Sequence, residues 1–252
     1  MSATTADGVR PGDAADDGAP AGRCTPTDPR PPARLPAAVL WDMDGTLVDT
    51  EPYWIDCEFE LVAEHGGTWS LDHAHALVGN SLLASAEYIR HHGGVELQPE
   101  QIVDRLLDGV VARVRGHVPW RPGAQELLAA LAAAQVPCAL VTMSYRRLAE
   151  AVLAALPPAA FATVVAGDDV TYGKPHPEPY LMAAARLGVL AADCVAIEDS
   201  PTGVASAVAA GVPVLAVEHL LPLDPGPGRY PVPTLVGVTP AQLAGLRSVP
   251  LG

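Results

Sequence analysis

The chain has 252 residues and a formal net charge of −14 at pH 7, with 49% hydrophobic and 17% charged residues. This length allows one large domain, or a core domain with a smaller one, and the composition is typical of a globular protein. The negative charge argues against nucleic acid or an anionic membrane as a partner, because both are bound through basic surface. It does not exclude a small phosphorylated substrate, since a local site can be cationic inside an acidic protein.

The four cysteines form no Cys-x-x-Cys spacing, so neither a structural zinc site nor a disulfide framework is predicted. No apolar stretch is long enough to span a bilayer, and the N-terminus lacks the segments of a secretion signal. We therefore expect a cytoplasmic protein. Residues 1–36 are rich in Ala, Asp, Gly, Thr and Pro and contain few large apolar side chains, so we expect a disordered leader.

The first expected element is a short buried strand at 37–41, where an apolar run is bounded by turn signals. Apolar residues at helical spacing then predict helices at 51–65, 70–78, 81–92 and 99–117. No strand signal interrupts them. Residues 52–118 are therefore predicted to form an all-helical cap domain that follows directly from the end of the first strand.

From Pro119 onwards, strand and helix patterns alternate. The expected helices are 123–135, 145–156, 178–187 and 201–210, and the expected strands are 138–142, 163–166, 194–197 and 212–217. This alternation predicts a Rossmann-like α/β core domain, built from 37–51 and 119–252, in which a parallel sheet has helices on both faces.

The C-terminal part of the chain carries weaker signals. Residues 220–233 are expected to form a proline-rich loop, and residues 234–238 a last edge strand. Thr239 is expected to cap a short helix that ends at Leu246.

Polar side chains follow several of the predicted strands. Asp42 and Asp44 follow the first strand, and Thr142 and Ser144 follow the second. Lys174 lies in a Gly-Lys-Pro loop after the third strand. Glu198 and Asp199 follow the fourth strand.

Because parallel strands end at one edge of a sheet, these side chains are expected to converge there. Carboxylates are suitable ligands for a hard cation, and hydroxyl and ammonium groups are suitable donors to phosphate oxygens. The inventory therefore fits magnesium-dependent phosphoryl transfer, with one carboxylate as nucleophile and a neighbouring one as acid and base.

Each residue also has a structural interpretation. Asp42 and Asp44 alone would fit a turn with helix-capping acids, and Lys174 alone would fit a solvated lysine. Glu198 and Asp199 would fit the N-cap of the helix that starts at Pro201. The combination of four strand ends favours the catalytic interpretation over these separate ones.

The sequence resembles the haloacid dehalogenase-like (HAD) superfamily. The resemblance covers about residues 37–217 and rests on Asp-x-Asp-Gly-Thr-Leu-x-Asp-Thr at 42–50, Val-Thr-Met-Ser at 141–144, Gly-Lys-Pro-x-Pro at 173–177 and Glu-Asp-Ser-x-x-Gly at 198–203. The placement of the helical insert resembles the subgroup that includes β-phosphoglucomutases, phosphoglycolate phosphatases and sugar phosphatases.

The resemblance implies a role for each site residue. Asp42 would attack phosphorus to give an aspartyl-phosphate, and Asp44 would protonate the leaving group and later deprotonate water. Asp199 would bind Mg²⁺ with the Asp42 carboxylate and the Asp44 backbone carbonyl. Glu198 would be either a further ligand of the ion or a residue that contacts one of its ligands.

The phosphate contacts follow from the same resemblance. Thr142 and Ser144 would hold phosphate oxygens, and Lys174 would balance the charge of Asp42 and the phosphoryl group. Residues 48–51 would form the flexible link to the cap.

The leading hypothesis is a Mg²⁺-dependent phosphatase that acts on a small phosphorylated metabolite, namely a sugar phosphate, a polyol phosphate or a phosphoglycolate-like acid. The alternative is a phosphomutase of the β-phosphoglucomutase type. Such mutases resemble this chain but usually carry His and Arg where Trp54 and Leu82 stand, which weakens the alternative. A catalytically silent binding module is a third hypothesis, although no acid and no lysine of the motifs is missing.

The sequence does not indicate which cap residues face the substrate. The candidates are Trp54 and five basic residues, Arg90, His91, Arg105, Arg113 and Arg115. Two histidine pairs, 73 with 75 and 91 with 92, are more simply solvated cap residues than metal ligands. Nothing in the sequence indicates an oligomeric state.

Overall fold

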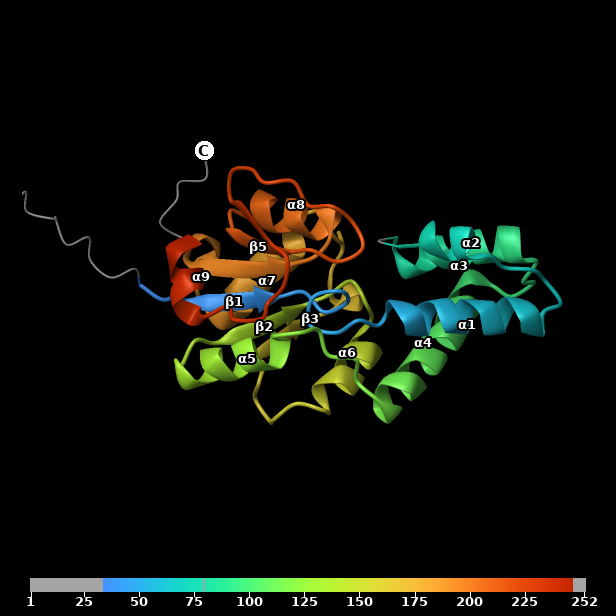
Figure 1. Ribbon diagram of the computed structural model, residues 1–252. Helices are drawn as coiled ribbons and strands as arrows, with labels where there is room; N and C mark the ends of the chain where they lie inside the picture. The colour runs from blue at the N-terminus through green and yellow to red at the C-terminus, as the bar shows by residue number, and fades with distance from the viewer. Residues whose placement is uncertain (1–33, 79, 247–252) are drawn as a thin grey trace, which may run out of the picture. The chain divides into compact units, whose positions relative to one another are not determined.

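The computed structural model describes residues 34–78 and 80–246. Its centre is a six-stranded parallel sheet (Figure 1). In spatial order, the strands are β3 (Thr163–Val165), β2 (Cys138–Val141), β1 (Ala38–Trp41), β4 (Cys194–Glu198), β5 (Val214–Val217) and β6 (Arg229–Val232). The parallel strands and their connecting helices confirm the predicted fold class.

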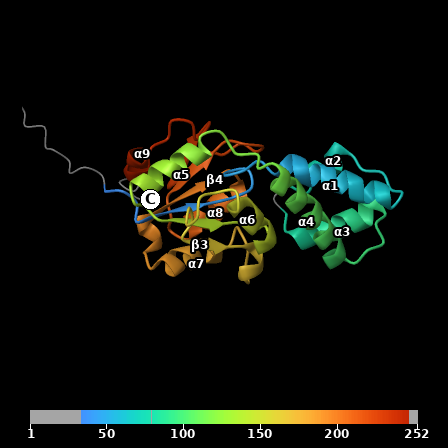
Figure 2. The same cartoon turned by 90° about the horizontal axis from the view of Figure 1, so that it is seen from below.

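Alternate residues of the central strands face two separate hydrophobic layers, which is why β1, β2 and β5 are apolar throughout. Val39 and Trp41 of β1 belong to the layer that is covered by α5, α6 and α9, whereas Ala38 and Leu40 belong to the layer covered by α7 and α8 (Figure 2). The bounds of these helices are α5 Ala124–Ala133, α6 Arg146–Leu153, α7 Glu178–Leu187, α8 Pro201–Ala209 and α9 Pro240–Leu246. The sheet therefore has helices on both faces, as predicted.

In the described residues between β1 and α5, the chain forms four helices and no strand (Figure 1). They are α1 (Glu51–Glu64), α2 (Leu71–His75), α3 (Leu82–Gly93) and α4 (Pro99–Gly116). The side chains of Ser70 and Ser81 accept hydrogen bonds from backbone N–H groups in the first turns of α2 and α3, as expected of N-cap residues. These helices form the inserted cap. The proposed cap boundaries at 52 and 118 stay a prediction.

The edge strand differs from the prediction. The expected strand at 234–238 does not form, and the expected proline-rich loop instead contains β6, which pairs with β5. Pro231 is tolerated in β6 because an edge strand needs ladder hydrogen bonds on one side only. The short helix after Thr239 is present as α9.

Of the predicted leader, residues 1–33 lie outside the described residues, and residues 34–36 have no regular secondary structure. Among the helices that the structure describes, none is long and apolar enough to cross a membrane.

Candidate active site

The predicted site residues converge at the carboxyl edge of the sheet. Strands β2, β1 and β4 are adjacent, and Thr142, Asp42 and Asp199 follow directly after them. Each of these three side chains is buried. The parallel register therefore brings together groups that are far apart in sequence.

Lys174 connects two of the carboxylates. Its Nζ donates to Asp42 Oδ1 and to Glu198 Oε1, both at 2.6 Å, and to the backbone carbonyl oxygen of Val141 at 2.9 Å. The three donors of the ammonium group thus have three acceptors. Burial lowers the pKa of Lys174, but the carboxylates of Asp42 and Glu198 raise it by more, so the net shift is upward and the side chain is a fixed cation.

Glu198 is fully buried and hydrogen-bonded through both oxygens. In addition to Lys174, Tyr180 Oη donates to Oε1 at 2.6 Å, and Ser200 Oγ donates to Oε2 at 3.2 Å. Gly203 makes room for this carboxylate, because a Cβ atom there would lie 2.0 Å from it. Glu198 is therefore held in one orientation behind Lys174.

Asp44 accepts hydrogen bonds from three hydroxyl groups. Ser144 Oγ donates to Asp44 Oδ2 at 2.8 Å and Thr142 Oγ1 donates to the same oxygen at 3.1 Å, while Thr50 Oγ1 donates to Oδ1. The residues predicted to hold phosphate oxygens therefore contact the predicted acid and base in this arrangement.

The turn after Asp44 requires glycine. Gly45 has a φ of +87°, and a Cβ atom there would lie 1.9 Å from Asp199 Oδ2. The next residue, Thr46, donates from its hydroxyl to Asp199 Oδ1 at 3.2 Å. The turn thus fixes the position of Asp199 next to the end of β1.

Asp42, Glu198 and Asp199 form the one acidic cluster with metal-ligand spacing that was found among the described residues, with ligand atoms within 4.8 Å of one another. Asp42 Oδ2 is buried and has no hydrogen-bond partner in the described part of the chain. Burial, followed by the charge of Glu198, raises the pKa of Asp42 to about 7, although Lys174 opposes the shift. Burial, Asp42 and Glu198 also raise the pKa of Asp199.

An all-oxygen cluster with an unpaired buried carboxylate oxygen and repelling acids is a suitable environment for a hard divalent cation. The residues present therefore fit Mg²⁺. Asp42 and Asp199 offer the available oxygens, whereas those of Glu198 already accept hydrogen bonds from Lys174, Tyr180 and Ser200.

A cavity of about 390 Å³ opens in front of these residues. Its core side includes Asp42, Asp44, Thr142, Ser144, Lys174, Asp199 and His219. Its cap side is formed by Glu51, Trp54 and Glu58 of α1, Leu77, Val78 and Asn80 after α2, Leu82 and Ser85 of α3 and Leu106 of α4. We refer to this cavity as the cleft.

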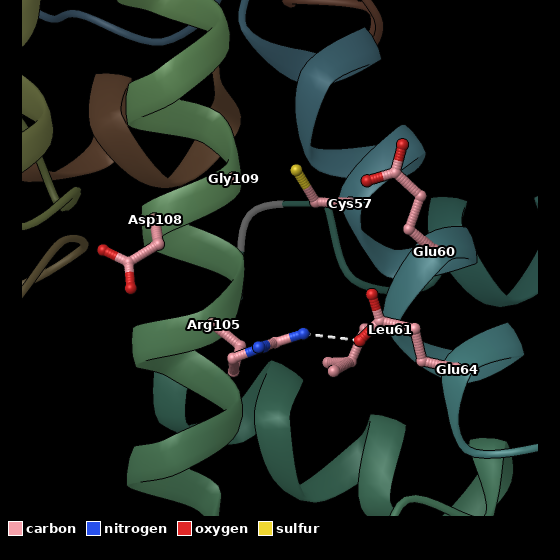
Figure 3. Close-up of a pocket in the computed structure, with 7 residues that line it drawn as sticks. All are labelled: Cys57, Glu60, Leu61, Glu64, Arg105, Asp108 and Gly109. Carbon is pink, nitrogen blue, oxygen red and sulfur yellow. Dashed lines mark hydrogen bonds and ion pairs between the residues drawn. The ribbon is translucent and has the colours of Figure 1, made fainter.

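The cap residues predicted from sequence divide into two groups. Trp54 lines the cleft, whereas Arg90, His91, Arg105, Arg113 and Arg115 do not. Arg105 instead lines a separate hollow of about 200 Å³ between α1 and α4, where it pairs with Glu64 (Figure 3). Arg113 pairs with Glu60 of α1.

Some residues of the site were not anticipated. Thr46 and Thr50 belong to the first motif, so their hydroxyl groups could have been included from their proximity to the acids. Glu58 and Tyr180 carry no motif signal, since both lie within helices whose orientation depends on packing.

The motifs and their geometry agree with a comparison against known families. A model described as haloacid dehalogenase-like hydrolase matches residues 36–211. The chain belongs to this family. It is accordingly a hydrolase enzyme, and the resemblance noted from its motifs is confirmed.

Individual relatives extend this result. The bifunctional riboflavin kinase/FMN phosphatase of Arabidopsis thaliana is 31% identical over 189 residues, which are 74% of this chain, and the match spans only half of that protein. Fructose-1-phosphate phosphatase YqaB of Escherichia coli is 31% identical over 185 residues, which are 73% of this chain and 97% of that protein. The crystal structure of CbbY from Rhodobacter sphaeroides in complex with phosphate is 25% identical, with a TM-score of 0.74, and the match covers 81% of this chain and 96% of that one.

Proposed function

We propose that the protein is a Mg²⁺-dependent phosphatase that hydrolyses a small phosphorylated metabolite, of the sugar phosphate, polyol phosphate or phosphoglycolate type, through an aspartyl-phosphate. The observation that carries the proposal is the arrangement of Asp42 and Asp44 at one end of the cleft, with Lys174 bonded to Asp42. The relatives named as phosphatases support the same reaction class.

In the first step, a carboxylate oxygen of Asp42 attacks phosphorus, and the bond from phosphorus to the substrate oxygen breaks. Asp44 transfers a proton to the leaving alkoxide. In the second step, Asp44 removes a proton from water, which attacks the same phosphorus and releases phosphate and the Asp42 carboxylate.

Lys174 opposes the rise in the pKa of Asp42 that burial causes, and it faces the developing charge with a cation that is already in place. A Mg²⁺ ion held by Asp42 and Asp199 would supply a second fixed positive charge for the phosphoryl oxygens. Glu198 acts on the reaction through Lys174, whose ammonium group it orients by a hydrogen bond. Tyr180 in turn holds Glu198 in place by a hydrogen bond from its hydroxyl group.

Thr142 and Ser144 have two roles in this scheme. In this structure, their hydroxyl groups donate to Asp44. A bound phosphate group competes for the same two donors, and Asp44 is then released to face the leaving group. Phosphate binding and the availability of the acid are thereby coupled.

A phosphomutase is the second candidate, because the fold is shared with proteins of that kind. The resemblance places a His and an Arg of the mutases where this chain has Trp54 and Leu82, and both of these side chains line the cleft. Neither side chain carries a positive charge for the second phosphate group that a mutase must bind. The cleft therefore favours hydrolysis.

The test is a screen of p-nitrophenyl phosphate and of phosphorylated sugars, polyols and short acids, each with Mg²⁺ and with EDTA. We expect phosphate release that requires Mg²⁺, and none from the Asp42→Asn variant. Absence of phosphate release from every ester would refute the proposal, and transfer of phosphate within a sugar without release would favour the mutase.

A further inference from the structure

In the described part of the chain, the cap side of the cleft has no lysine or arginine side chain that could bind a second anionic group of a substrate. Lys174 is the one lysine or arginine among the described residues that line the cleft. Its three donors are already bonded to Asp42, Glu198 and Val141. The basic residues of the cap that were candidates from sequence, such as Arg105 and Arg113, pair with carboxylates outside the cleft.

Glu58 stands out among the cap residues of the cleft. Its side chain lies in α1, is only 5% exposed, and still lines the cavity. Trp69 Nε1 donates to its Oε2 at 3.2 Å. No described residue donates to or accepts from its other oxygen, Oε1. With Oε2 fixed by Trp69 and Oε1 without a partner among the described residues, this carboxyl group can offer Oε1 to a polar atom of a ligand in the cavity.

The protonation of Glu58 supports the same interpretation. Burial raises the pKa of Glu58 to about 8, with the Trp69 hydrogen bond opposing the shift and the charge of Glu51 adding to it. The carboxyl group is then largely protonated at neutral pH, so it can donate as well as accept. A hydroxyl group complements both capacities.

The rest of the cap lining suits a carbon skeleton with hydroxyl groups. Trp54 offers an aromatic surface, and Ser85 offers a hydroxyl group on a buried position of α3. Leu77, Leu82 and Leu106 are apolar. A few convergent polar groups in an otherwise apolar lining are typical of sites that orient a small neutral molecule.

We propose that Glu58 binds a hydroxyl group of the substrate, and that the cleft takes monophosphates of uncharged polyhydroxy compounds, sugars or sugar alcohols, in preference to phosphoesters with a second anionic group. This inference rests on the proposed phosphatase function and selects among its substrate classes. A distal carboxylate or second phosphate would lose its hydration and meet no lysine or arginine among the described side chains on the cap side of the cleft.

The first experiment compares substrates on the wild-type protein with Mg²⁺. We expect kcat/KM for a hexose monophosphate and a hexitol monophosphate to exceed that for phosphoglycolate and for a hexose bisphosphate by at least about tenfold. Turnover of p-nitrophenyl phosphate with a preference for phosphoglycolate or the bisphosphate would overturn the inference and leave the phosphatase proposal standing. No turnover of any ester, p-nitrophenyl phosphate included, would refute the phosphatase proposal itself.

The second experiment tests Glu58 directly. In Glu58→Leu, we expect kcat/KM for the hexitol monophosphate, divided by kcat/KM for p-nitrophenyl phosphate, to fall about tenfold, because a polar partner of the skeleton is lost. Glu58→Gln keeps an acceptor for Trp69 and a polar tip, so most of this ratio should be retained. Glu60→Leu is the matched control, since this carboxylate lies on the same helix, is exposed and is outside the cleft.

A ratio that is unchanged in Glu58→Leu would overturn the role of Glu58, as would an equal fall in Glu60→Leu. Should Glu58→Leu fail to fold, the wild-type comparison and Glu58→Gln still decide. In Glu58→Gln, the ratio of kcat/KM for the hexitol monophosphate to kcat/KM for p-nitrophenyl phosphate should stay close to the wild-type value. Complete loss of the preference for the hexitol monophosphate in this variant would contradict the proposed polar contact.

Discussion

The two ends of the cleft are built in different ways. At the core end, Lys174, Asp42 and Glu198 are nearly or fully buried and joined by short hydrogen bonds. Each lies at or just after the end of a strand, or in a proline-containing loop. At the cap end, Glu58 has a single hydrogen bond to Trp69, and most of its neighbours in the lining are apolar. The core end is therefore suited to one fixed reaction. Residues of the cap end can be substituted with few consequences for the hydrogen-bonded charges at the core end.

This difference predicts where substitutions act. A change at the core end removes part of a connected set of charges, so it should affect stability and catalysis together. A change at the cap end alters few contacts, so it should affect the choice of substrate and the local protonation equilibrium.

The largest effect is expected for Lys174→Met. This variant leaves Asp42 and Glu198 without their counter-charge, which should lower the free energy of unfolding by about 3–5 kcal/mol and reduce kcat on the order of a hundredfold or more. Denaturant unfolding and phosphate release measure the two quantities.

Arg147→Met is the control for Lys174→Met. Arg147 forms ion pairs with Asp104 and Asp108 at the surface, where such pairs contribute about 0–1 kcal/mol. A Lys174→Met protein as stable as Arg147→Met would contradict the view that the core end is a connected network.

A smaller effect is expected for Gly45→Ala, with Gly188→Ala as its matched control. Both glycines have positive φ, +87° and +69°. A Cβ atom at Gly45 would collide with Asp199, whereas one at Gly188 would meet nothing within 4 Å. Gly188→Ala should therefore cost only the backbone strain, about 1–2 kcal/mol, with unchanged kcat.

Gly45→Ala carries the same strain and in addition displaces Asp199, so its kcat should fall by about tenfold or more. In a titration with Mg²⁺, half-maximal activity of this variant should also require a higher metal concentration than in the wild type. Equal behaviour of the two alanine variants in kcat would argue that the close approach of Gly45 to Asp199 has no catalytic importance.

The same contrast explains what the sequence could predict. Asp42, Thr142, Lys174 and Asp199 were found because parallel strands end at one edge, so their positions in sequence define their positions in space. The edge strand β6 was missed because Pro231 and the glycines around it are typical of a loop, and pairing with β5 overrides that preference.

The cap end could not be predicted in the same way. The periodicity of α1 indicates that one face is buried, but not which residues of that face lie towards the cleft rather than towards neighbouring helices. Glu58 faces the cleft while Glu60 pairs with Arg113 outside it. That difference depends on how the cap helices pack, for which a single sequence carries no signal. Tyr180 was missed for the same reason, since the packing of α7 directs its hydroxyl group to Glu198.

The smallest effect is expected at the cap end, in the pH dependence of stability. Folding raises the pKa of Glu58 from 4.5 to about 8, mainly through burial. The folded state therefore binds more protons than the unfolded state between these values, and its stability must fall as the pH rises through this window. In Glu58→Gln, this contribution is absent, because an amide does not titrate.

The difference in Tm between Glu58→Gln and the wild type should therefore shift in favour of the variant from pH 5 to pH 9, and thermal unfolding across that range measures it. Glu60→Gln is the matched control because its carboxylate is exposed on the same helix. A Tm difference that stays constant for Glu58→Gln would mean that the Glu58 carboxyl group keeps its solvent contact in the folded protein. The cap end would then be more open to water than the hydrogen bond from Trp69 and the burial of α1 indicate, and its preference for a neutral skeleton would have to come from Trp54 and the apolar lining alone.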